Sequence, residues 1–255
     1  MRKVAYLVRN LFGDLVPDPM KGRAFGGIGV LGLSAVTPSE GDLSLVGLWS
    51  AIGQNFVLPS EIERGTKKNF TKDKAARFSS GVESLQGAIE AAWKKWEISL
   101  IIPGPDGYLS SEQLALDYES YFSQTGRNLR TWIRGSDVSA KCGEKSFYSE
   151  SVLKHVGGAA SFGYYVVTVV PFSMERAGEY ANLAETLWLL IAFRAARGGS
   201  LLKEGESVMT SSCCERVPDR VIVDVTPEGI EPSYLTRDGH VPSVGFVVSH
   251  VSMCK

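Results

Sequence analysis

Cysteine is scarce and scattered in this chain. Its 255 residues include four cysteines, none in CxxC spacing and none beside a pair of histidines. That scarcity excludes a disulfide framework and a zinc motif built from local ligands. Cys213 and Cys214 are adjacent, so on a strand their side chains would point to opposite faces. We expect reduced thiols with a structural role at all four positions: Cys142, Cys213, Cys214 and Cys254.

Long hydrophobic runs are also missing. The longest, Leu187–Phe193, is far shorter than the ~20 residues that cross a bilayer. The first ten residues carry three basic side chains and no apolar core of the kind found in signal peptides. We therefore expect a soluble, cytoplasmic protein that has no membrane partner.

An excess of either charge is absent as well. Lysine and arginine number 27 against 28 aspartates and glutamates, a net charge of −1, so overall charge would not bind the chain to nucleic acid, although a local patch could. A content of 44% hydrophobic and 22% charged residues excludes disordered and coiled-coil chains. A chain of this length buries roughly 70–75% of its unfolded surface. We expect one domain, 1–255, with a possible division into a strand- and loop-rich part, 1–80, and an α/β core, 81–255.

Three helix starts are predicted from capping signals. Ser80–Glu83 and Ser110–Gln113 fit the capping box and precede apolar stripes, and Ser173 precedes a long apolar stretch that Gly198 ends. Apolar, β-branched runs predict the strands, which are 3–8, 24–36, 97–102, 129–133, 162–170, 207–211, 220–225 and 244–251. Together these elements predict an α+β (mixed α/β) fold, either ferredoxin/RRM-like or a layered sheet with helices packed on it.

Motifs for catalysis and cofactors fail on their context. The GxGxxG match at 27–32 leads into a proline turn at Pro38 instead of a helix, which a dinucleotide site requires. Ser161 is followed by Asp224 and His240 in hydrolase order, but it precedes its strand, whereas a nucleophile elbow follows one. The three histidines are isolated from one another. We expect no catalytic residue, no metal and no cofactor.

Two places are kept for an alternative, a small-molecule enzyme of α/β type. The Pro103–Ser110 loop lies between a strand end and a helix start, where α/β sheets bind ligands, and it holds Asp106. Glu204 and Glu206 could share a divalent cation at a strand start. An ordinary turn and a polar hairpin rim would explain the same residues without a ligand.

The largest local charge asymmetry is a basic run from Arg64 to Arg77. It has only Asp73 opposing its cations and is interrupted by Phe70. We expect the segment from Glu61 to Arg77 to be an exposed linker or a basic loop. Mobile cations interleaved with aromatic residues are typical of phosphate and base contacts. Arginines at 127–134 form a second cluster. The predicted nucleic-acid-binding residues are Arg64, Lys67, Lys68, Lys72, Lys74, Arg77, Arg127 and Arg130.

The order of elements from Phe162 to Val225 resembles part of a known family. This segment resembles the C-terminal part of the RNA-recognition-like core of the RAMP backbone subunits of CRISPR complexes. The shared order is a strand, a long helix, a polar loop, a short strand, Val217-Pro218-Asp219 and a further strand. Arg77-Phe78-Ser79-Ser80 is similar to a basic-Ser-Ser segment in some of them. The resemblance implies a non-catalytic RNA-binding subunit whose partners are RNA or another polyanion and other protein subunits. A structural or capsid-like protein that assembles with copies of itself is a further alternative.

Overall fold

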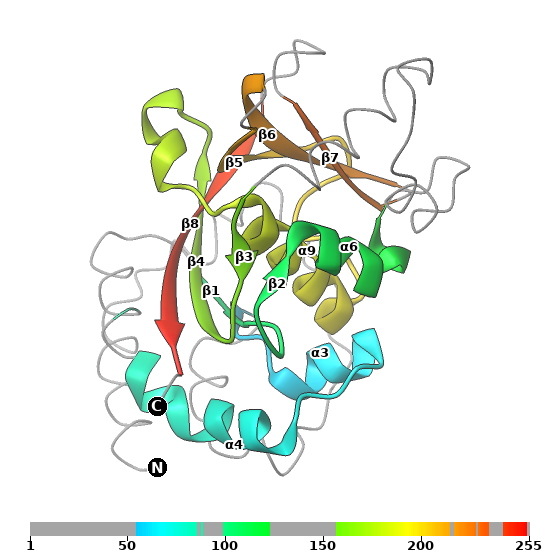
Figure 1. Ribbon diagram of the computed structural model, residues 1–255, viewed down its shortest axis with the longest axis vertical. Helices are drawn as coiled ribbons and strands as arrows, with labels where there is room; N and C mark the ends of the chain where they lie inside the picture. Colours follow the sequence, from blue (N-terminus) through cyan, green and yellow to red (C-terminus); the bar gives the residue numbers. More distant parts are fainter. Residues whose placement is uncertain are drawn as a thin grey trace, which may run out of the picture.

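A six-stranded sheet forms the centre of the computed structural model, which describes residues 55–85, 88, 99–122, 157–214, 217–227, 229–234 and 242–253 (Figure 1). The strand order is β1-β4-β8-β5-β6-β7, and neighbours are antiparallel except β5 and β8. The strands are β1 (Ser99–Pro103), β4 (Gly163–Pro171), β5 (Ser207–Cys214), β6 (Val217–Thr226), β7 (Gly229–Tyr234) and β8 (Val244–Ser252). Two short strands, β2 (Leu109–Ser110) and β3 (Ala159–Ala160), pair separately. The α+β prediction is confirmed. The strands expected at 3–8, 24–36 and 129–133 lie outside the described residues.

The predicted central strand, β4, is flanked by β1 and β8 and is almost wholly buried. The apolar residues of β6 are buried on both faces of the sheet. Val221, Val223 and Val225 enter the main core, whereas Ile222 enters a smaller core on the opposite side. This is the two-residue period of a strand.

Helices cover one face of the sheet. The longest, α9 (Leu183–Arg197), packs against β1, β5 and β6, and α3 (Pro59–Thr66) and α6 (Ser111–Asp117) pack against α9 (Figure 1). Gly65 allows close approach of α3, because a Cβ atom there would collide with the backbone of Ala195. The remaining helices are α4 (Lys72–Ser80) and the 3₁₀ helices η4 (Gly81–Leu85), η5 (Glu119–Tyr121) and η6 (Met174–Glu179). None of the helices in the described part of the chain is long and apolar enough to cross a membrane.

Two helix starts differ from the predicted ones. Ser80 is the last residue of α4, its hydroxyl donates to the Arg77 carbonyl, and a 3₁₀ helix, η4, begins directly after it at Gly81. Ser173 precedes only the short η6, while α9 begins after Asn182, which forms a capping box with Glu185. The third prediction is confirmed, because Ser110 Oγ accepts from the Gln113 amide at 3.2 Å.

The expectation of a linker or basic loop between residues 61 and 77 is also wrong. This segment forms most of α3 and α4, joined by a turn in which Lys67 has a left-handed φ of 57°. Phe70 and Phe78 are buried instead of exposed. The segment has few apolar residues and they are widely spaced, so its sequence shows no helical periodicity, and its burial depends on packing against the rest of the chain.

Candidate nucleic-acid interface

The six basic residues from Arg64 to Arg77 lie on α3, on α4 and in the turn between them, and we refer to them as the α3–α4 surface. Helix α4 is anchored by Phe78, whose ring lies 5.0 Å from the Tyr164 ring and 4.7 Å from the Phe162 ring. The Tyr164 hydroxyl also donates to the Phe78 carbonyl at 3.2 Å. This anchoring gives the cations of α4 a defined position relative to β4.

Helix α3 is held by a buried ion pair that sequence reasoning missed. Glu61 bonds to the Arg197 guanidinium at the end of α9, and their side chains are 2% and 9% exposed. Glu61 also accepts from the Leu58 amide at 2.8 Å, and Arg197 donates to the Phe56 carbonyl at 2.8 Å. The two residues are 136 positions apart in sequence. No local signal could have paired them.

Four cations of the α3–α4 surface are exposed and have no ion pair with any residue in the described ranges. They are Arg64, Lys67, Lys72 and Arg77. A buried cation needs a counter-charge, but an exposed one in water does not, so these four remain able to bind an anion.

The other two cations contact the body of the protein. Lys68 Nζ lies 3.6 Å from Asp117 Oδ1 and 4.3 Å from the centre of the Tyr118 ring. Burial, helped by nearby Asp117, raises the pKa of Tyr118 to about 12, so that ring faces the lysine as a neutral phenol. These contacts assign Lys68 a packing role in addition to its charge.

Lys74 links α4 to the Pro103–Ser110 loop. Its Nζ lies 3.1 Å from Asp106 Oδ1, donates to the Asp106 carbonyl, and lies 5.6 Å from the centre of the Phe162 ring. The basic run and one candidate enzyme site are therefore neighbours in space. Asp106 has a protein cation as its partner, which accounts for it without a ligand.

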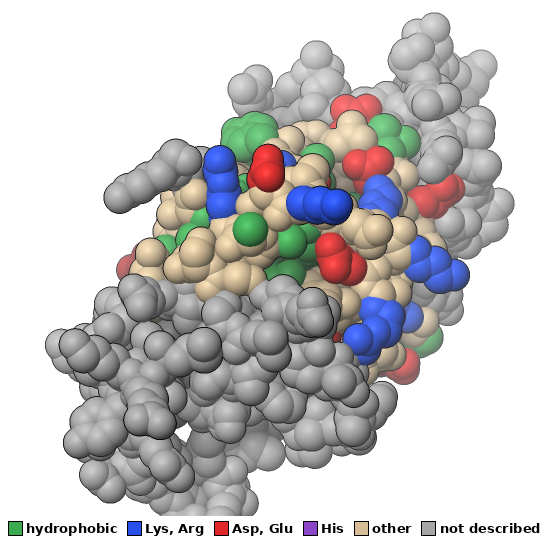
Figure 2. Space-filling view, turned by 90° about the horizontal axis from the view of Figure 1, so that it is seen from below, with side chains coloured by type: hydrophobic (Ala, Val, Ile, Leu, Met, Phe, Trp, Pro, Cys, Tyr) green, Lys and Arg blue, Asp and Glu red, His purple; other side chains and the backbone are tan. Residues whose placement is uncertain are grey.

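Acidic side chains limit the charge of this surface. Glu63 accepts from the Phe70 amide at 2.7 Å and so closes the turn between α3 and α4, while Asp73 is exposed four residues before Arg77. Figure 2 views the end of the molecule where α4 lies and shows blue basic side chains interspersed with red acidic ones. The α3–α4 surface therefore has a moderate excess of basic over acidic side chains and is not continuously basic. Arg127 and Arg130, the other predicted binding residues, lie outside the described residues.

The second enzyme candidate, Glu204 with Glu206, forms a tight turn. Glu206 Oε2 accepts from the Lys203 amide at 3.0 Å, and Gly205 takes the left-handed conformation that this turn requires. Across the described ranges, no three histidine, cysteine, aspartate or glutamate side chains gather as a metal site would need. Cys213 is a free, exposed thiol at the far end of β5.

Ser161 contacts a histidine, but a different one from the sequence match. Its Oγ lies 3.3 Å from His250 Nε2 on β8, and its amide donates to the Tyr165 hydroxyl at 2.8 Å. Burial lowers the pKa of His250, and this is partly offset by hydrogen bonds from the ring to the backbone of Phe162 and Ser161. No carboxylate in the described ranges orients this ring, as a hydrolase triad requires.

Asp224, the acid of that sequence match, lies elsewhere. Its two oxygens accept from Ser207 Oγ at 2.6 Å and Ser233 Oγ at 2.9 Å, across β5 and β7. His240 lies outside the described residues. The pairing of Ser161 with Asp224 is therefore not formed.

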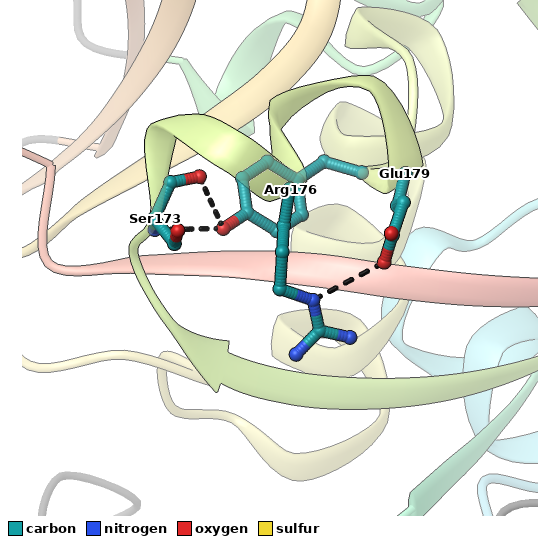
Figure 3. Close-up of polar contacts among 4 residues, drawn as sticks. Ser173, Arg176 and Glu179 are labelled. Atoms are coloured by element: carbon teal, nitrogen blue, oxygen red, sulfur yellow. Dashed lines mark hydrogen bonds and ion pairs between the residues drawn. The ribbon is translucent and has the colours of Figure 1, made fainter.

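Arg176, in the segment around η6, forms an ion pair on the surface. Arg176 Nε lies 3.1 Å from Glu179 Oε2, and the amide and carbonyl of Ser173 bond the Tyr180 hydroxyl at 2.9 and 3.1 Å (Figure 3). Tyr180 in turn packs on Gly245, where a Cβ atom would collide with its ring. This loop packs on β8, and its cation is paired like Lys68 and Lys74 of the α3–α4 surface.

No protein-family model, no curated protein and no solved structure matches the chain. Two details bear on the segments that resemble RAMP subunits. Val217–Asp219 forms the start of β6 instead of a link between two strands, and Arg77–Ser80 is the end of α4, directly followed by the 3₁₀ helix η4. The functional argument therefore depends on this chain's own side chains.

Proposed function

We propose that the α3–α4 surface binds single-stranded RNA and that the protein acts as a non-catalytic subunit of a larger assembly. One observation carries the proposal. Arg64, Lys67, Lys72 and Arg77 are exposed and lack a carboxylate partner in the described ranges. They lie on α3, on α4 and in the turn between them, and the buried Glu61–Arg197 pair and Phe78 hold these two helices in place. Fixed cations contact phosphates at lower entropic cost than mobile ones.

The sharpest test removes charge without removing packing. Lys68 and Lys74 are unsuitable because they contact Asp117, Tyr118, Asp106 and Phe162. Changing Lys72→Gln with Arg77→Gln removes two of the cations that have no ion pair with any described residue. RNA affinity should fall for all RNA sequences. The slope of log K against log salt concentration should become shallower by about 0.7 for each cation removed.

A matched control is Arg176→Gln with Lys203→Gln, which removes the same charge elsewhere. Affinity for a 12-nucleotide RNA, measured by fluorescence anisotropy at several salt concentrations, should change little in this variant. Equal loss in both variants would indicate a general charge effect and refute a site on α3 and α4. Sizing of the native particle, with absorbance at 260 and 280 nm, separates an RNA-bound subunit from a self-assembling shell.

A further inference from the structure

Tyr108 is unusual among the described residues. Its side chain is 78% exposed, and Met174 is the one other large hydrophobic side chain that is exposed in the described ranges. Tyrosine combines an apolar ring with a polar hydroxyl and is enriched at interfaces, so this exposed ring is a candidate binding residue. The ring has no hydrogen bond or ring contact within the described ranges.

The loop that carries Tyr108 is firmly held on both sides. The Trp188 indole donates to the Pro103 carbonyl at 2.8 Å, and the Gly104 amide donates to the Gly163 carbonyl at 2.6 Å. Immediately after Tyr108, Leu109 pairs with Ala160. Binding a partner would therefore order little beyond the tyrosine side chain itself, which keeps the entropic cost low.

The same loop is joined to the α3–α4 surface. Lys74 bonds both the carbonyl and the carboxylate of Asp106, and only Gly107 separates Asp106 from Tyr108. Two residues span at most about 7 Å, so the ring begins within that distance of the residue that α4 contacts. The exposed aromatic ring is therefore carried by the loop that Lys74 of α4 contacts.

We propose that Tyr108 stacks on a base of the bound strand, which makes the site selective for single-stranded over double-stranded RNA. Exposed cations contact phosphates in either form, but only an unpaired base offers a free face to an aromatic ring. This inference rests on the proposed function, and it adds that the protein recognises an unpaired base of the RNA as well as its phosphates.

The test compares three polyanions against two variants of Tyr108. Base stacking is worth about 1–3 kcal/mol, so Tyr108→Ala should weaken binding of a 12-nucleotide single-stranded RNA about 10-fold. Binding of inorganic polyphosphate, and of a duplex of the same sequence, should be unchanged. Tyr108→Phe keeps the ring and should retain affinity. Met174→Ala, which shortens the other exposed hydrophobic side chain, is the matched control.

The outcomes separate this inference from the proposed function. If the unmodified protein binds neither RNA nor polyphosphate, both fail. If it binds both and Tyr108→Ala leaves RNA affinity unchanged, stacking is excluded and the charge-based proposal stands. If Tyr108→Ala weakens polyphosphate as much as RNA, the effect is not stacking. Circular dichroism and thermal melting of each variant establish that the fold is retained.

Discussion

At the scale of single residues, Gly163 is required by its position at the start of β4. Its φ of 143° lies in a region that other residues rarely adopt, and a Cβ atom would lie 2.7 Å from His250 Nε2 and collide with the Val251 carbonyl. We predict that Gly163→Ala lowers the free energy of unfolding by about 2–4 kcal/mol, measured by urea denaturation. Gly178→Ala, where no atom is within 4 Å, should change it by less than about 1 kcal/mol.

His250 should make stability depend on pH with a defined sign. Burial lowers the pKa of this imidazole below its ordinary value of about 6.5, so at mildly acidic pH the unfolded chain binds the proton more readily than the folded one. The contribution of His250 is therefore complete above about pH 6.5 and is lost as pH falls toward the folded pKa.

His250→Gln removes this titration. We predict that the melting temperature of the unmodified protein falls more steeply between pH 7.5 and pH 5 than that of the variant. Burial raises the pKa of Glu185, which acts with the opposite sign, but Glu185 is present in both proteins and cancels in the comparison. Parallel curves would show that His250 titrates alike in the folded and unfolded chains.

At the scale of elements, the Glu61–Arg197 pair ties the start of α3 to the end of α9. Removing the Glu61 carboxylate leaves the buried Arg197 charge uncompensated and deprives the Leu58 amide of its acceptor. We predict that Glu61→Ala costs about 3–5 kcal/mol in the free energy of unfolding. The exposed Arg176–Glu179 pair is the comparison, and Glu179→Ala should cost less than about 1 kcal/mol. Similar costs for the two substitutions would contradict a structural role for the buried pair.

Elements defined by local periodicity could be predicted from sequence, and their boundaries could not. The apolar, β-branched runs at 162–170 and 244–251 were predicted as strands and form β4 and β8, and β4 is almost wholly buried. Helix starts failed where capping signals compete. Ser80–Glu83 fits a capping box, yet the preceding residues already form α4. Ser173 precedes the same apolar stretch as Asn182–Glu185, and the latter pair is the one that caps α9. Strand β7, with Pro232 inside it, lacks the composition typical of strands.

At the scale of the whole molecule, the candidate site could be predicted only in part. The charge excess at 64–77 is a local property and is visible in sequence, but which cations stay unpaired depends on contacts with α6 and the Pro103–Ser110 loop. The exposure of Tyr108 has the same origin. The packing of separate elements, not the composition of one segment, decides which residues remain open to a ligand.

The near-zero net charge of the molecule makes one acidic residue on the α3–α4 surface informative. Asp73 is exposed on α4 among the cations and repels phosphate, so Asp73→Asn should strengthen RNA binding. Two unit charges roughly 7 Å apart interact by about 0.6 kcal/mol in water, which corresponds to about threefold in affinity at low salt and less at high salt.

The matched substitution is Glu175→Gln on η6, which gives the same change in net charge away from α4 (Figure 1). If RNA responds to the field of the whole protein, both substitutions should raise affinity equally. If it binds the α3–α4 surface, only Asp73→Asn should, and its effect should disappear in the Lys72→Gln, Arg77→Gln background, because no phosphate is then held close to residue 73. Anisotropy titrations of the four proteins at two salt concentrations distinguish a bound strand at this surface from diffuse attraction.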